Sequence, residues 1–99
     1  MVLIRRQIEI VNALGLHLRA ADKFVHEAQQ HQAEVRVSLD GRAVNGKSIR
    51  GLTTLAAECG TRIDLEADGP DAEEAIAALC GLIEARFDEN DGQDNPPTP

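Results

Sequence analysis

The chain has 99 residues, 42% of them hydrophobic but only 2% aromatic, and it carries a net charge of −7 at pH 7. This length provides for one domain with a single core, which must be aliphatic. An acidic chain without a basic and aromatic patch is a poor nucleic-acid binder, and without a run of about 18 apolar residues it has no predicted membrane span. Its start places charge after a brief apolar patch, unlike a signal peptide, so we expect a cytoplasmic protein.

The first third of the chain predicts a strand followed by a helix. Apolar and polar residues alternate over Gln7–Val11, which is the period of a half-buried strand, and Leu3 and Ile4 can extend it. From Leu18 onward, apolar residues recur at helical spacing and define one buried face. The polar stretch that begins at Gln30 predicts the end of this helix.

The middle of the chain predicts a hairpin and a short helix. Glu34–Leu39 alternates clearly, and Asp40-Gly41 after it is a strong two-residue turn signal, so Arg42–Val44 should pair back antiparallel. Ser48 is well placed to cap the N-terminus of the next helix. Gly60 is expected to end that helix, as glycine commonly does.

The last third predicts a strand over Thr61–Ala67 and a long helix after it. Asp71 with Glu74 has the spacing of a capping box, with Gly69 as the alternative cap. The apolar face of this helix runs to Phe87.

The resulting element order, βαββαβα, indicates an α+β protein. The hairpin makes the sheet at least partly antiparallel, and the three helices can all cover one face. The pattern fits an open-faced sandwich and equally a ferredoxin-like fold with an extra helix. We expect one domain over residues 1–87. Residues 88–99 are acidic, rich in Gly and Pro and without apolar side chains, which predicts a disordered tail.

His17 stands where the first loop becomes the first turn of a helix. The first N–H groups of a helix lack partners inside it, and the helix dipole adds partial positive charge, so this is an anion site. Arg19 adds a cation two residues on. A neutral imidazole near pH 7 has one free nitrogen lone pair. The arrangement therefore predicts a histidine that carries or handles an anion, with a phosphoryl group as the first candidate, and the amides of Leu18 and Arg19 can stabilise it.

Two segments carry a family resemblance. Gly15–Ala21 resembles the active-site signature of HPr, the phosphocarrier of the phosphoenolpyruvate-dependent phosphotransferase system. Asn45–Ile49 resembles the stretch of that family that carries a regulatory serine and opens its second helix. The resemblance runs from about Gln7 to about Phe87. It implies an HPr-like open-faced β-sandwich, in which three helices cover one face of a four-stranded antiparallel sheet.

The resemblance also implies a function. His17 would accept a phosphoryl group on Nδ1 from phosphorylated enzyme I and pass it to an enzyme IIA, with Arg19 as the charge partner. The protein would be a relay without turnover of its own, needing no cofactor. Ala20 replaces the proline of the commoner family pattern, and the ending Ile83–Glu89 resembles the nitrogen-related branch, NPr. Both the sugar and the nitrogen branch stay open.

Other residues near the two motifs have two interpretations each. Ser48 is a helix cap, and by resemblance also a target of an HPr kinase/phosphorylase. Ile49 is either core or part of a docking patch. Arg50, Lys23 and Lys47 are candidate docking residues or ordinary solvated surface. We expect a monomer.

Asp22 departs from what a phosphate carrier needs. It lies one turn from His17, where it suits the helix dipole but would repel a phosphoryl group if it pointed inward.

Other kinds of site find little support in the sequence. Cys59 and Cys80 lie far apart without a CxxC pattern and are expected to be free thiols. His26 and His31 are five residues apart, the wrong step for a shared helical face, so no metal site is predicted. The competing functional class is an HPr-like docking module that binds partners without phosphorelay. A ligand-binding domain unrelated to phosphotransfer would require both motifs to be coincidental.

Overall fold

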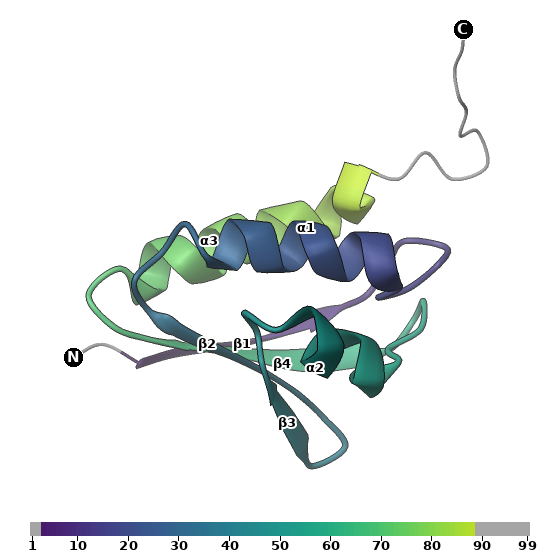
Figure 1. The fold of residues 1–99 in the computed structure, drawn as a ribbon, viewed down its shortest axis with the longest axis horizontal. Coiled ribbons are helices and arrows are strands. Elements are labelled where there is room, and N and C mark those ends of the chain that lie inside the picture. The colour runs from purple at the N-terminus through teal and green to yellow at the C-terminus, as the bar shows by residue number, and fades with distance from the viewer. Residues whose placement is uncertain (1–2, 89–99) are drawn as a thin grey trace, which may run out of the picture.

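The computed structural model describes residues 3–88 and contains one four-stranded sheet with three α-helices (Figure 1). The elements in chain order are β1 (Leu3–Glu9), α1 (Leu18–Ala28), β2 (Glu34–Leu39), β3 (Arg42–Asn45), α2 (Ile49–Leu55), β4 (Arg62–Asp68), α3 (Ala72–Glu84) and the 3-10 turn η1 (Arg86–Asp88). The sheet order is β1-β4-β2-β3, and every neighbouring pair is antiparallel. The predicted order βαββαβα is confirmed.

The strands alternate between a buried face and an open face, as the sequence period predicts. Val35 and Val37 of β2 and Ile63 and Leu65 of β4 are fully buried. Helices α1 and α3 lie together over this face, and α2 packs against α1 and β3 (Figure 1). All three helices contribute to a single core. The fold is therefore the open-faced sandwich.

The open face of the sheet carries a row of paired charges. Cross-strand register places Glu66 of β4 between Arg5 of β1 and Arg36 of β2. Its carboxylate lies 2.7 Å from Arg5 Nη2 and 2.9 Å from Arg36 Nη2. The hydrogen bond from Arg5, followed by that from Arg36, lowers the pKa of Glu66. Polar side chains thus cover the face that no helix covers.

One predicted helix end was wrong. The short helix α2 ends at Leu55, where Ala56 adopts a left-handed conformation with φ of 55° and donates its amide to the Thr53 carbonyl. Gly60, predicted to end the helix, lies in the loop before β4 with φ of 93°. The earlier end lets the chain bury Ala57, two residues after the buried Leu55. The α1 helix ends at Ala28 with Gln29 as its C-cap, directly before the polar stretch that predicted its end.

The predicted capping box at the start of α3 was also wrong. Asp71 occupies the N-cap position, but its side chain makes no capping hydrogen bond. Its carboxylate instead accepts the amides of Gln32 at 2.9 Å and Ala33 at 2.8 Å. The hydrogen bond from the Gln32 amide, and to a smaller extent that from Ala33, lowers the pKa of Asp71. The residue joins α3 to the loop between α1 and β2.

The end of the described chain folds back on α1. Helix α3 ends at Glu84, and Arg86 and Phe87 take positive φ values of 61° and 54°. This turn buries the Phe87 side chain, and its carbonyl accepts a 2.7 Å hydrogen bond from Lys23 Nζ. The predicted tail, apart from Asp88, lies outside the described residues.

Candidate functional site

A tight turn delivers the chain from β1 to His17. The Gly15 amide donates to the Asn12 carbonyl at 3.1 Å, and Asn12 Nδ2 donates to the Gly15 carbonyl at 2.7 Å. Asn12 is fully buried, unlike most asparagines. Sequence analysis did not single it out, although Asn at the first and Gly at the fourth position of a turn is a known signature.

Gly15 lets this turn approach the segment after α2. Its φ is +70°, and a Cβ built there would lie 2.6 Å from the Ala57 carbonyl oxygen and 2.9 Å from Glu58 Cα. The next amide, that of Leu16, donates to the same Ala57 carbonyl at 2.8 Å. The position of His17 therefore depends on close backbone contact between two segments about 40 residues apart.

His17 is the N-cap of α1, which confirms its predicted place at the start of this helix. Its backbone is extended, with φ of −80° and ψ of −178°, and its carbonyl accepts the first helical hydrogen bond from the Ala21 amide at 2.8 Å. Its side-chain Nδ1 accepts the amide of Arg19 at 3.2 Å. Because Nδ1 accepts, its lone pair points out of the ring toward the first turn of the helix.

His17 lies between two shallow surface hollows. One, of about 520 Å³, is lined by Leu18, Arg19 and Asp22 of α1 and by Ile49 at the start of α2. The other, of about 480 Å³, lies toward the segment after α2. The imidazole is partly exposed, so a partner protein can reach it from solvent.

The charges beside His17 are few and exposed. The first turn of α1 contains no acidic residue. Arg19 is exposed, and within residues 3–88 its guanidinium makes no ion pair. An unpaired guanidinium next to a helix N-terminus can bind an anion through charge-assisted hydrogen bonds. Asp22 is the acidic residue that shares this hollow.

Ser48 caps α2, which confirms its predicted structural role. Its Oγ accepts the Gly51 amide at 3.1 Å, and its side chain is partly exposed. Ile49, the next residue, lines the hollow that contains His17. The two motifs found in the sequence are therefore neighbours in space. Arg50 is exposed on the same helix.

The two lysines predicted for docking are engaged within the chain. Lys23 Nζ binds the Phe87 carbonyl, as described above, and Lys47 Nζ donates to the His31 carbonyl at 2.8 Å. Both side chains are half-buried. The structure therefore brings Ile49, and neither lysine, to the hollow at His17.

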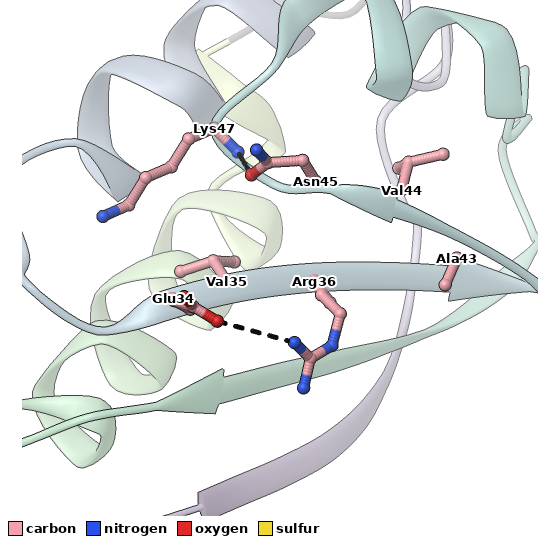
Figure 2. Close-up of a pocket in the computed structure, with 7 residues that line it drawn as sticks. All are labelled: Glu34, Val35, Arg36, Ala43, Val44, Asn45 and Lys47. Carbon is pink, nitrogen blue, oxygen red and sulfur yellow. Dashed lines mark hydrogen bonds and ion pairs between the residues drawn. The ribbon is translucent and has the colours of Figure 1, made fainter.

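Lys47 instead belongs to a separate hollow between β2 and β3, about 390 Å³ in volume. Figure 2 shows an ion pair between Glu34 and Arg36, which lie two residues apart on β2, while the Lys47 side chain extends away from that pair. The Glu34 Oε1 and Arg36 Nη1 atoms are 3.7 Å apart. The Lys47 amide donates to Asn45 Oδ1 at 2.8 Å. Glu34 pairs with Arg36, Lys47 Nζ binds the His31 carbonyl, and no histidine or thiol lines this hollow, so it offers no comparable chemistry.

Other kinds of site were sought in the described part of the chain. Among residues 3–88, no group of three or more His, Cys, Asp or Glu side chains is placed to hold a metal ion. Cys59 is exposed, Cys80 is buried, and both are free thiols. No helix within the same residues is long and apolar enough to cross a membrane.

Comparisons with known proteins point to one family. The family described as the PTS HPr component phosphorylation site matches residues 4–85. The phosphocarrier protein HPr of Neisseria meningitidis serogroup A is 49% identical over 89 residues, covering 90% of this chain and all of the relative. The phosphocarrier protein NPr of Shewanella violacea is 38% identical over 89 residues, covering 90% of this chain and 98% of the relative. The crystal structure of HPr-C-His from Thermoanaerobacter tengcongensis superimposes with a TM-score of 0.85 at 42% identity, covering 88% of this chain and 98% of that one.

Proposed function

This chain belongs to the HPr family of phosphotransferase-system phosphocarriers, and we propose that His17 is its phosphoryl acceptor. Phosphorylated enzyme I would donate the group to Nδ1 of His17, and a histidine of an enzyme IIA would receive it. The observation that carries this proposal is the Nδ1 lone pair directed at the first turn of α1, beside the unpaired Arg19 guanidinium.

The geometry supports a direct in-line transfer. The Nδ1 lone pair attacks phosphorus, a P–N bond forms on His17, and the P–N bond of the donor breaks with its electron pair staying on the donor nitrogen. The Arg19 amide, which now donates to Nδ1, can then donate to a phosphoryl oxygen. The Arg19 side chain neutralises part of the added charge. Phosphoryl transfer asks the protein mainly for such positioning and charge stabilisation.

In this proposal residues 1–87 act as one cytoplasmic, monomeric carrier domain that is a substrate of its partners and has no turnover of its own. The phosphohistidine would persist until an acceptor docks. Ile49 and Arg50, on the adjacent α2 helix, would contact partners.

Ser48 would serve as a second, regulatory phosphorylation site for an HPr kinase/phosphorylase. Its hydroxyl is partly exposed while its oxygen caps α2. A phosphate there would add roughly two negative charges at a helix N-terminus, which the helix tolerates. The same charges would repel an acidic partner surface next to Ile49.

The test is incubation with phosphoenolpyruvate and either the sugar-type or the nitrogen-type enzyme I, followed by intact mass measurement and site mapping under alkaline conditions. The proposal predicts one acid-labile phosphoryl group on His17, and the faster donor identifies the branch. A folded protein that takes no label from either donor would refute the relay and favour a docking module.

A further inference from the structure

Asp22 occupies an unusual place for an acidic residue in a phosphate carrier. It is exposed on α1, one turn beyond Arg19, and it lines the same hollow as His17, Arg19 and Ile49. It is the fifth residue of the helix, beyond the first turn in which the dipole favours a negative charge. The stability of α1 therefore gains little from a carboxylate at this position.

The Asp22 carboxylate also lacks the pairing that other acidic residues of this protein have. Glu66 lies between two arginines, and Asp71 accepts two backbone amides. Within residues 3–88, by contrast, the carboxylate of Asp22 makes no hydrogen bond or ion pair. Its charge therefore acts on whatever enters the hollow.

We propose that Asp22 tunes the phosphoryl-transfer equilibrium of His17 by disfavouring the phosphorylated state. This inference rests on the proposed function. A phosphoryl group on Nδ1 brings about two negative charges into the hollow that Asp22 lines, and like charges at short range repel. Asp22 also lies three residues from Arg19 on the helix, where it can compete with the phosphoryl group for the guanidinium.

The consequence is a carrier that holds its phosphoryl group less tightly. Repulsion in the phosphorylated state shifts the exchange with enzyme I toward the donor and raises the driving force for transfer to the acceptor. The effect acts through charge, so it must weaken as salt screens the hollow. It therefore depends on the charge of the Asp22 side chain and not on its exact shape.

The experiment measures the equilibrium constant for phosphoryl exchange between enzyme I and the carrier, at low salt and at about 1 M salt. Asp22→Asn removes the charge at nearly constant shape and should raise the constant about threefold at low salt, with the gain shrinking at high salt. Asp22→Glu keeps the charge and should behave like the parent protein. Asp40→Asn removes the same charge from the β2–β3 turn, where asparagine tolerates the φ of 51°, and should leave the constant unchanged.

The outcomes separate this inference from the proposed function. If all proteins label on His17 but Asp22→Asn equals the parent at low salt, the role of Asp22 is refuted and the relay stands. An electrostatic role is also refuted if the equilibrium constant of Asp22→Asn stays raised at high salt, or if Asp22→Glu raises the constant too. If no variant labels while thermal melting shows all of them folded, the relay itself fails.

Discussion

The two ends of α1 each have a histidine, and the two surroundings are opposite. His17 at the N-terminus is partly exposed beside charges that are unpaired within residues 3–88. His31, just past the C-terminus, has a side chain only 14% exposed. Its Nε2 lies 3.2 Å from Glu27 Oε2 and its Nδ1 lies 3.5 Å from Asp71 Oδ2, while its carbonyl accepts Lys47 Nζ.

This difference separates a histidine that is available for chemistry from one that holds the fold. Both ring nitrogens of His31 face carboxylates, and its backbone joins α1 to the segment before α2. His17 Nδ1 faces a backbone amide, which can donate to a phosphoryl oxygen instead. Both side chains are imidazoles, so the residue type does not distinguish the two roles. The groups that contact the ring nitrogens do.

The largest expected difference between the two histidines appears when each imidazole is removed in turn. His17→Ala should abolish phosphoryl acceptance and cost about 1 kcal/mol of stability, since the fold loses the N-cap of α1. His31→Ala should keep acceptance and lower the melting temperature. Labelling by enzyme I and thermal unfolding monitored by circular dichroism measure both. Acceptance that survives His17→Ala, or that is lost in a folded His31→Ala protein, contradicts the account.

Removal of the Arg19 charge next to His17 should give the next largest effect, on the rate of phosphoryl acceptance. Arg19→Ala should slow phosphoryl acceptance by roughly 10- to 100-fold, because a charge-assisted contact to the transferred group is lost. The measurement is the initial rate of labelling at fixed enzyme I. Arg62→Ala, which removes an exposed arginine from β4, is the matched control and should change the rate less than twofold. Equal slowing by both variants would show a general charge effect.

A pair of glycine substitutions tests whether the turn at Gly15 positions His17. Gly15→Ala introduces a Cβ 2.6 Å from a backbone carbonyl at positive φ, and should cost about 2 to 4 kcal/mol and slow labelling. Gly81→Ala, in α3, meets no atom within 4 Å and should stabilise by up to about 1 kcal/mol. Chemical denaturation compares the two. A neutral Gly15→Ala would show that the close approach to Ala57 does not position His17.

The smallest expected effect is on the pH dependence of stability, and it concerns Asp71 near the C-terminal end of α1. The pKa of Asp71 lies below its ordinary value of 3.8 because backbone amides bind its carboxylate. Its ionised form therefore stabilises the fold above about pH 4, and this contribution is lost as the pH falls through the lowered value. Asp71→Asn should be less stable than the parent at pH 7, and the difference should shrink on acidification. A difference that is constant between pH 7 and pH 2 would contradict this.

The local features of the site were predictable because short-range chemistry fixes them. The Asp40-Gly41 turn has φ values of 51° and 82°, as the hairpin signal requires. His17 and Ser48 cap their helices through side-chain acceptors. Each of these features depends on residues within three or four positions in the chain.

The features that sequence analysis missed depend on segments distant in the chain. The lysine ammonium groups bind the carbonyls of Phe87 and His31, and these contacts are not evident from the sequence. The Asp71 carboxylate does not cap its own helix but accepts two amides that lie 38 and 39 residues away in the chain. Ala56 takes the left-handed conformation that glycine would favour, since Ala57 must reach the turn before His17. No periodicity encodes such contacts.

The most direct test of the central claim is phosphorus-31 and nitrogen-15 NMR of the protein phosphorylated by enzyme I at alkaline pH. The account predicts phosphorus coupled to Nδ1 of His17, a large shift of the Arg19 amide as it exchanges the ring nitrogen for a phosphoryl oxygen, and unchanged resonances at His31. Phosphorus on Nε2 or on another residue, or an Arg19 amide that does not move, would contradict it.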